Sequence, residues 1–290
     1  MPRSPKPDRH LRLWPWLLLA PGLLWLLVLY LLPLLSLLPL SLSQPLNRFG
    51  LETVFSLHWQ NYRDVLQLHG AVLLRSLRTA GLATGLGLVL AYPLALAIRF
   101  HGGRWQPLLM GLVVLPSLTS SLVRAIAWST LLGDGGPVLA LLHGVGLLRD
   151  GRLLNTGTAV VLGLTTSLLP FLVLPLVVAL QRIDRRLLEA AADLHAGPLA
   201  TFGRVIWPLS QPGLRAGLLL SLIPAAGDVV NPRFLGGPED RMVANTIENL
   251  LLVQLQAPRA AALTLVLMAL VSGVLVLQLR NGGIEELPLP

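Results

Sequence analysis

The segment Glu189-Ala-Ala-Ala-Asp-Leu-His-Ala-Gly-Pro198 separates two long apolar stretches, and it decides how the rest of the chain is interpreted. It is short, charged and rich in residues that favour helix. The surrounding chain has 290 residues, of which 54% are hydrophobic and only 12% are charged. Because soluble domains carry about 25% charged residues, this composition predicts an integral membrane protein in a lipid bilayer.

Charge and residue usage exclude several function classes. The net charge of +8 comes from arginines at the ends of apolar stretches, which favours a membrane surface over nucleic acid. The chain has no cysteine and its histidines are scattered, so no metal site is predicted. The single lysine, Lys6, lies in a proline-rich tail, so a P-loop for ATP cannot form in this chain. No G-x-S-x-G nucleophile elbow occurs either. The chain is therefore not expected to be an enzyme, and a membrane enzyme ranks third among the alternatives.

Apolar stretches of about 20 residues predict an all-α fold with six transmembrane helices. The fifth is the weakest, because Arg215 and Asp228 lie within it. Residues 58–68 predict a short surface helix, and residues 135–148, too short to span, predict an interfacial or re-entrant helix. The six predicted spans are residues 14–40, 79–98, 107–132, 154–180, 209–234 and 260–279.

The basic residues predict the orientation of these spans. A signal peptide is not favoured, because residues 13–43 lack any charge over a length that exceeds a signal h-region. The positive-inside rule favours a cytoplasmic N-terminus, and six spans then place the C-terminus in the cytoplasm too. The basic residues that support this assignment are Arg3, Lys6, Arg9, Arg12, Arg99, Arg104, Arg182, Arg185, Arg186, Arg204 and Arg280.

Small residues in the second span predict close helix packing. The sequence TAGLATGLG contains two pairs at four-residue spacing, Ala80 with Thr84 and Gly81 with Gly85. Such spacing lets two helix backbones approach each other in a membrane.

The loop after the fourth span predicts two short helices in residues 181–208. Asp184 is a helix N-cap, and Gly197-Pro198 ends the first helix because the residue before proline avoids the helical region. Pro198 can then begin the second helix. Leu187, Ala191 and Leu194 form an apolar stripe, while Glu189 and Asp193 share another face. The loop is either a linker lying on lipid headgroups or a docking element, and its paired acids favour a protein partner with a basic groove.

At this point the chain resembles a known family. Glu189-Ala190-Ala191, followed by a turn and by Ile206-x-Pro208-Leu209, is similar to the EAA loop of permease subunits of type I ABC importers. In that family the loop is a coupling helix that docks into a cleft of the ATPase subunit. The resemblance implies that role for Glu189, Ala190, Ala191, Asp193, Leu194, His195 and Gly197.

The sequence departs from the family pattern at the turn. The family's glycine falls on His195, with Gly197 two residues later. Either Gly197 makes the turn, or His195 adopts the left-handed conformation itself. Trp207 also stands where the family usually has an aliphatic residue.

Further motifs occur in the family's order and resemble its spermidine/putrescine branch. They are NYRDVL (61–66), AYPLALAI (91–98), LPSLTSSLVR (115–124), LPFLVLPL (169–176), PLSQPGLRAG (208–217) and GDVVNPRFLGGPED (227–240). The resemblance implies a multi-pass protein of the bacterial inner membrane that imports polyamines. Related permeases serve ferric iron, phosphonate or thiosulfate. A stand-alone channel or secondary transporter is the remaining alternative.

The resemblance also implies the protein's partners and domain layout. Two ATPase subunits would bind ATP and Mg²⁺, this chain holding no cofactor. A second permease, identical or paralogous, and an extracytoplasmic substrate-binding protein would complete the transporter, with no nucleic acid involved. Residues 1–12 would form a cytoplasmic tail, 13–70 the first span and an external loop, 71–280 the permease core, and 281–290 a C-terminal tail.

Arg124 and Asp228 are charges predicted at similar depth in the outer part of the membrane. Such charges are costly and need an explanation. In one hypothesis both face the translocation path, with Asp228 favouring a cationic amine and Arg124 either pairing with Asp228 or gating the path. In the other, both are structural and extend toward the outer headgroups.

Overall fold

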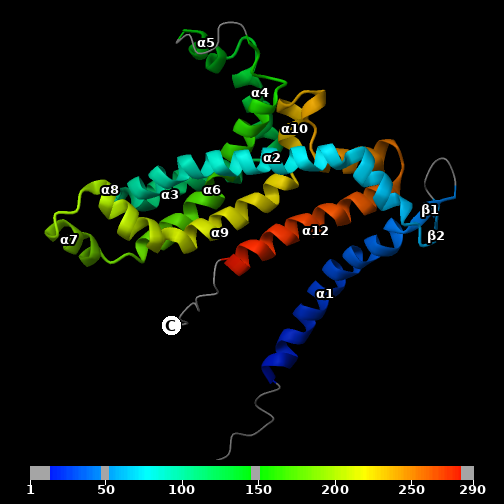
Figure 1. The fold of residues 1–290 in the computed structure, drawn as a ribbon, viewed down its shortest axis with the longest axis horizontal. Coiled ribbons are helices and arrows are strands. Elements are labelled where there is room, and N and C mark those ends of the chain that lie inside the picture. Colours follow the sequence, from blue (N-terminus) through cyan, green and yellow to red (C-terminus); the bar gives the residue numbers. More distant parts are fainter. Residues whose placement is uncertain (1–13, 47–51, 145–150, 282–290) are drawn as a thin grey trace, which may run out of the picture. The chain divides into compact units, whose positions relative to one another are not determined.

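The computed structural model describes residues 14–46, 52–144 and 151–281. The chain divides into two compact units, Met1–Gln67 with Leu250–Val266 and Leu68–Asn249 with Leu267–Pro290. The predicted tail 1–12, nearly all of the tail 281–290 and the end of the predicted interfacial helix 135–148 lie outside the described residues. The regular elements are helices α1 (Trp14–Ser41), α2 (Gln60–Leu96), α3 (Gln106–Val114), α4 (Ser121–Leu132), α5 (Pro137–Gly144), α6 (Gly157–Gln181), α7 (Arg185–Asp193), α8 (Pro198–Thr201), α9 (Trp207–Ala226), α10 (Val230–Leu235), α11 (Val243–Glu248) and α12 (Ala257–Asn281), with strands β1 (Ser43–Pro45) and β2 (Thr53–Phe55) (Figure 1).

The first unit is held together where α1 ends and α2 begins. Strands β1 and β2 form a short antiparallel hairpin in which Ser43 pairs with Phe55. The Asn61 side-chain amide donates to the backbone carbonyls of Ser41 and Ser43, both at 2.9 Å. Tyr62 adds a hydroxyl–hydroxyl hydrogen bond to Ser41 at 2.7 Å. The NYRDVL motif therefore fastens α2 to the end of α1, and residues 60–68 continue into the long helix without a break instead of forming a separate surface helix.

The second unit is built around α6. This helix begins at the N-cap Thr156, whose side chain accepts from the Ala159 amide at 3.3 Å. It packs against α9, α10, α3 and α4, and buries more side chains than any other helix described. α6 and α9 run side by side, joined at one end by α7 and α8 (Figure 1).

Glycines on α9 bring it close to α6. A Cβ placed on Gly213 would lie 2.5 Å from the Ala179 Cβ and 2.5 Å from the Pro175 carbonyl oxygen. A Cβ placed on Gly217, one turn later, would lie 3.3 Å from the Leu172 Cα and carbonyl oxygen. Small residues four apart therefore do mediate helix packing, but on α9 and not at the predicted glycine pair.

The predicted packing face of the second span is only partly correct. Ala80 and Thr84 are buried, whereas Gly81 and Gly85 are exposed and a Cβ on either would meet nothing within 4 Å. α2 instead presents Gly87, whose Cβ would lie 2.7 Å from a Leu172 methyl group. The prediction for the glycine pair was wrong because the neighbouring helix decides which face of α2 is buried. Residue spacing alone does not reveal that face.

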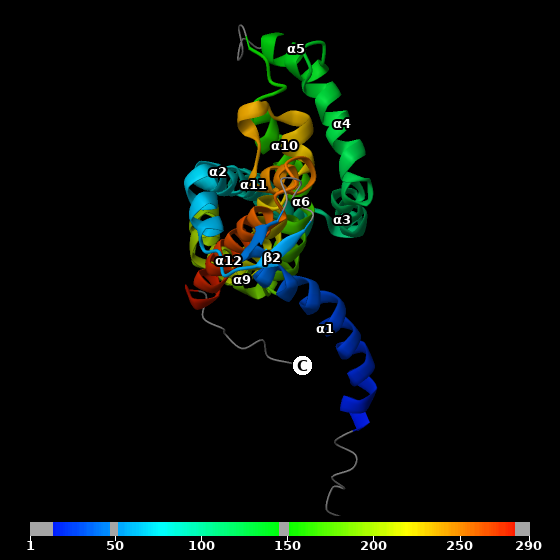
Figure 2. The same cartoon turned by 90° about the vertical axis from the view of Figure 1, so that its right-hand side faces the viewer.

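The predicted third span is interrupted. After α3 the chain makes a 3₁₀ turn at Leu115–Leu118, and Thr119 is extended with ψ 150° before α4 begins at Ser121. Pro116 has no amide hydrogen, and its own carbonyl is taken up by the Thr119 hydroxyl at 2.7 Å. Figure 2 shows α4 leaving α3 at a steep angle.

The predicted fifth span is interrupted as well. α9 ends at Ala226, and Gly227 to Val229 separate it from α10. Among the described residues, five helical stretches are long and apolar enough to cross a membrane, and α9 is not one of them. One of the five, Ser121–Gly144, joins α4 to α5 through a bend. The five are Leu18–Ser41, Gln60–His101, Ser121–Gly144, Gly157–Gln181 and Ala257–Gln278.

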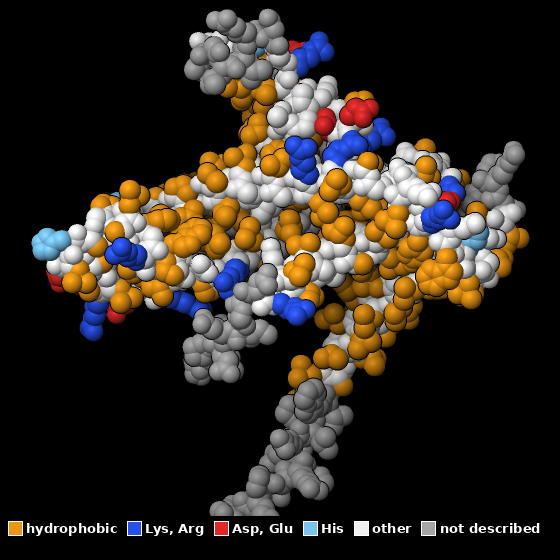
Figure 3. Space-filling view, viewed as in Figure 1, with side chains coloured by type: hydrophobic (Ala, Val, Ile, Leu, Met, Phe, Trp, Pro, Cys, Tyr) orange, Lys and Arg blue, Asp and Glu red, His pale blue; other side chains and the backbone are white. Residues whose placement is uncertain are grey.

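Side-chain chemistry of the visible surface agrees with lipid contact. Apolar side chains cover much of the long helices, whereas charged side chains collect around α7 and α8 and around α10 (Figure 3). On α1, every described leucine between residues 18 and 32 is exposed, as expected for a helix that faces hydrocarbon.

Candidate functional site

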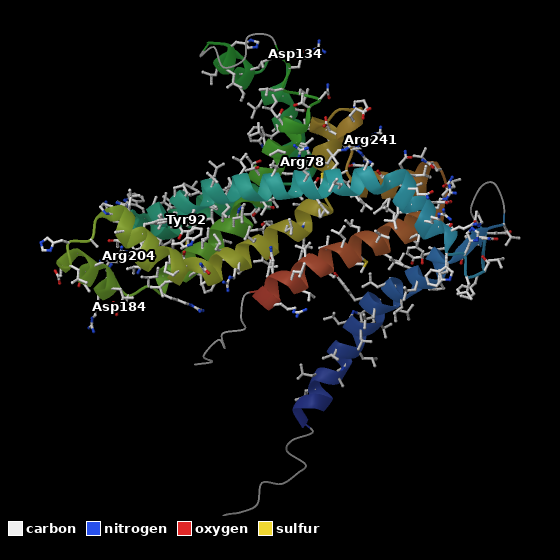
Figure 4. All side chains as sticks on the ribbon, in the orientation of Figure 1. Arg78, Tyr92, Asp134, Asp184, Arg204 and Arg241 are labelled. Carbon is white, nitrogen blue, oxygen red and sulfur yellow. The ribbon has the colours of Figure 1, made fainter. Side chains whose placement is uncertain are left out.

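The loop between α6 and α9 begins with the predicted cap. Asp184 is the N-cap of α7, and its Oδ1 accepts from the Arg186 amide at 3.0 Å. α7 then runs from Arg185 to Asp193, which confirms the predicted first helix. Figure 4 labels Asp184 and Arg204 at the end of the molecule where α7 and α8 lie.

α7 presents most of its surface to solvent. Glu189, Ala190 and Asp193 are exposed, and no ion pair involves either carboxylate in the part of the chain that is described. Of the predicted apolar stripe, only Ala191 is buried; Leu187 is 47% exposed and Leu194 is 82% exposed. The stripe exists but is not covered by this chain.

The turn after α7 is made by His195. Its φ of 58° lies in the left-handed region, while Gly197 has φ −64° and ψ 163°. The Ala196 amide donates to the Ala191 carbonyl at 2.9 Å and the His195 amide to the Ala192 carbonyl at 2.9 Å. This pair of bonds is the Schellman helix ending, which usually has glycine at the left-handed position. Of the two alternatives left open by the sequence, the structure therefore has His195 in the left-handed conformation.

Aromatic side chains pack against the return half of the loop, which is the part that follows the His195 turn and leads into α9. Pro198 is the first residue of α8, as predicted, and a π-helical turn at Phe202–Ile206 leads into α9. The ring of Tyr92, from α2, lies 5.5 Å from the Phe202 ring and 5.6 Å from the Trp207 ring. The Tyr92 hydroxyl also shares a hydrogen bond of 2.5 Å with Ser210.

An arginine contacts the chain at the start of the outgoing half of the loop, which is the part that leaves α6 and includes α7. α2 continues into a π-helical turn at Ala97–His101, and Arg99 within it donates from Nε to the Leu180 carbonyl at 3.2 Å. Sequence reasoning missed both Tyr92 and Arg99 as loop contacts. Tyr92 was part of a motif, but nothing in the sequence identifies a partner more than 80 positions away.

The two charges predicted within the membrane have separate partners. Arg124 donates from Nη1 to the Pro116 carbonyl at 2.8 Å, at the break between α3 and α4. Asp228 accepts from the Asn231 amide at 2.8 Å and from its side-chain nitrogen at 2.9 Å, at the start of α10. Among the described residues, the two charges form no ion pair with each other.

The segment around α10 packs against the first half of α6 through glycines. A Cβ on Gly163 would lie 2.3 Å from a Leu235 methyl group and 2.7 Å from the Asn231 Oδ1. The Asn155 amide donates to the Leu235 carbonyl at 2.9 Å. A Cβ on Gly237 would lie 2.8 Å from the Asn155 carbonyl oxygen, so glycines on both sides allow the two segments to approach closely at this point.

Ser76 ties the following segment to α2, and Asn245 ties the same segment to the residue before α10. The Asn245 side chain donates to the Val229 carbonyl at 2.8 Å, and the Ser76 hydroxyl accepts from the Val243 amide at 2.7 Å. Arg233 is hydrogen-bonded to Glu248, and this contact lowers the pKa of the Glu248 carboxyl. Within the described residues, no group of three or more His, Asp or Glu side chains could hold a metal ion.

The chain is similar to permeases of known transporters. It is 39% identical to the spermidine/putrescine transport system permease protein PotB of Haemophilus influenzae over 85% of this chain and 87% of that protein. It is 35% identical to PotB of Escherichia coli K12, covering 87% and 92%.

A solved structure shares the fold. A bacterial ABC transporter involved in the import of the acidic polysaccharide alginate superposes with TM-score 0.65 at 18% identity, covering 95% of this chain and 97% of that chain. A second structure of the bacterial alginate ABC transporter, in complex with an alginate pentasaccharide-bound periplasmic protein, has TM-score 0.67 at 17% identity. The predicted type I ABC importer permease fold is confirmed.

The family assignment rests on most of the chain. Residues 83–281 match the family described as binding-protein-dependent transport system inner membrane component. This match, the PotB relatives and the apolar helices identify a multi-pass protein of the inner membrane. The chain belongs to the family of binding-protein-dependent transport system inner membrane components.

Proposed function

We propose that this chain is the permease subunit of an ATP-driven importer and forms the translocation path for polyamines such as spermidine and putrescine. The similarity that carries this proposal is 35–39% identity to spermidine/putrescine permeases over 85–87% of the chain. Within the proposal, the chain crosses the membrane six times and both termini lie in the cytoplasm. The proposal keeps the domain boundaries predicted from the sequence. They apply to both tails, to the first span with its external loop, and to the permease core.

The loop at residues 181–208 is proposed to couple the chain to an ATPase subunit. Leu194 and Leu199 are 82% and 87% exposed on either side of the His195 turn. Each leucine would contribute about 1.5–3 kcal/mol on full burial, so a partner's apolar cleft would hold this tip firmly. The exposed carboxylates of Glu189 and Asp193 fit basic residues at the rim of such a cleft.

The remaining partners follow from this function. Two ATPase subunits bind ATP and Mg²⁺, and this chain itself holds no cofactor. A second permease, either a copy of this chain or a paralogue, completes the path through the bilayer. An extracytoplasmic substrate-binding protein delivers the polyamine. Support for this last partner comes from the family description and from the similar transporter solved with a periplasmic protein.

The contacts of Arg124 and Asp228 support a structural role for these charges, through hydrogen bonds within the chain and not through the predicted extension toward headgroups. Arg124 satisfies a carbonyl at a helix break, and Asp228 accepts from the Asn231 amide in the first turn of α10. Both tasks would be needed whatever passes through the membrane. Asp228→Asn is therefore expected to leave substrate preference unchanged, and a changed preference between spermidine and putrescine would instead support a place in the path.

The proposal is tested on the complex purified in mild detergent from native membranes. The measurements are the identity of co-purifying chains, ATP hydrolysis, and spermidine uptake after reconstitution with the binding protein. Glu189→Arg introduces a like charge at the proposed basic rim and is expected to release or uncouple the ATPase. The matched control is Glu239→Arg, an exposed acid outside the loop. A chain that purifies without an ATPase, and that Glu189→Arg does not affect, would support the channel or secondary-transporter alternative.

A further inference from the structure

We propose that α2 holds both ends of the loop between α6 and α9, with Tyr92 and Arg99 as positioning residues that pass loop movement into the membrane. This inference rests on the proposed coupling function of the loop. Tyr92 contacts Phe202 and Trp207 in the return half of the loop, and Arg99 contacts Leu180, the residue just before its outgoing half. The two residues are seven positions apart, about two helical turns on one helix.

The contact with the return half joins three aromatic rings and a hydrogen bond. Tyr92 is only 7% exposed, and its ring packs edge-on against Phe202 at an interplanar angle of 77°. Trp207 lies against the same ring and is also 6.2 Å from Phe202. The Ser210 hydroxyl, which is fully buried, completes the contact at 2.5 Å. Phe202 begins the π-helical turn and Trp207 follows its last residue, so Tyr92 fixes the direction in which the loop enters α9.

The contact with the outgoing half is electrostatic. The last carbonyls of a helix lack intrahelical partners and carry partial negative charge, which favours a cation there. Arg99 supplies that cation at the Leu180 carbonyl, one residue before α6 ends, and this carbonyl also accepts from the Ile183 amide at 3.3 Å. The Leu180 and Ile183 side chains are buried at the same point, so the start of the loop is anchored by packing as well.

These contacts determine which helices respond when a partner moves α7. Without them, force on the loop would act on α6 and α9 alone, through the covalent chain. With them, both ends of the loop also bear on α2, which is long and apolar enough to cross the membrane. Helices that contain π-helical turns have a built-in point of irregular register, and such turns often occur at functional sites. Here one lies in the α2 extension and one in the loop.

The test removes the contacts while keeping the side-chain shapes. Tyr92→Phe and Ser210→Ala each delete one hydroxyl of the same hydrogen bond, and the double variant closes a cycle. Arg99→Gln removes the charge at the Leu180 carbonyl. The controls are Tyr62→Phe, which loses a hydroxyl bond to Ser41 away from the loop, and Arg104→Gln, an exposed arginine. The measurement is spermidine transported per ATP hydrolysed by the complete reconstituted transporter, together with the amount of ATPase that co-purifies.

The expected result is about a threefold to tenfold lower transport per ATP in each loop-contact variant, with ATPase association retained. Tyr92→Phe and Ser210→Ala share one bond, so their effects should be less than additive in the double variant; Ser210→Ala also removes the hydrogen bond that its hydroxyl donates to the Trp207 carbonyl at 3.0 Å. If the ratio of transport to hydrolysis is unchanged while only thermal stability falls, the contacts are structural and the inference is overturned. A wild-type complex without any ATP-driven uptake would instead overturn the proposed function. Ser210→Ala removes a single atom, so it tests the contact even if the tyrosine variant assembles poorly.

Discussion

Replacing His195 with glycine should strengthen the end of α7. His195 holds φ 58° because the Schellman bonds at Ala191 and Ala192 require a left-handed residue at this position. A side chain in this conformation costs roughly 1–2 kcal/mol relative to glycine. Glycine in turn loses about 0.5–1 kcal/mol of extra chain entropy on folding. The net gain from His195→Gly is therefore about 0.5–1 kcal/mol.

Amide hydrogen exchange on the complete chain in detergent measures this gain directly. Local opening of α7 exposes the amides of residues 194–196, so their exchange should slow about twofold to fivefold in the glycine variant. His195→Ala serves as the matched control. Alanine retains the cost of the left-handed conformation, so it should exchange at about the wild-type rate.

Gly197→Ala provides the refuting result. Gly197 has negative φ and a Cβ there would meet nothing within 4 Å, so alanine should stabilise the loop by about 0.4–1 kcal/mol. If Gly197→Ala instead speeds exchange and His195→Gly does not slow it, the turn is made by Gly197 and the reasoning about His195 is wrong.

Three further predictions concern stability in detergent, measured by thermal unfolding. Gly163→Ala should cost about 1–3 kcal/mol because its methyl group would meet a leucine methyl at 2.3 Å, whereas Gly81→Ala, in open space, should not destabilise the protein. Asn61→Ala should cost about 1–3 kcal/mol, since two carbonyls lose their donor; an unchanged midpoint would show that water replaces it. The pKa of Glu248 is lowered by Arg233, so the contribution of this pair is present above the ordinary pKa of 4.5 and is lost as pH falls through the lowered value. Glu248→Gln should therefore flatten the acid end of the stability profile, and an unaltered profile would contradict the assignment.

Local chemistry predicted the elements of the loop well. The Asp184 cap and the Pro198 start both follow from backbone hydrogen-bonding needs within one helical turn, and both are confirmed. The choice between His195 and Gly197 was left open because either residue satisfies local rules. The choice depends on which residue, in the left-handed conformation, lets the following amides bond to the last carbonyls of α7.

Tertiary contacts explain what the sequence left undetermined. Gly81 with Gly85 and Gly213 with Gly217 carry the same spacing, yet only the second pair faces another helix. The breaks after Leu118 and Ala226 were predicted as continuous spans, because hydropathy averages over a proline or glycine that redirects the backbone. The β1–β2 hairpin was missed since strands of three residues leave no periodic pattern.

The contacts of Tyr92 and Arg99 could not be predicted for a different reason. Each joins residues far apart in the chain, at separations of 118 and 81 positions. A tyrosine or an arginine near the end of an apolar stretch is ordinary, since both residue types favour the membrane interface. Only the fold reveals that the two residues reach opposite ends of one loop.

α1 is long and apolar enough to be stable in lipid by itself. No part of its most apolar 18-residue window is buried within the protein. A helix of this kind is stable in the bilayer before it has neighbours, since its backbone hydrogen bonds are satisfied internally. During synthesis it can leave the translocon alone, ahead of the helices that must find one another. Substitutions on its surface are then expected to change the yield of membrane insertion and to leave the assembly of the later helices intact.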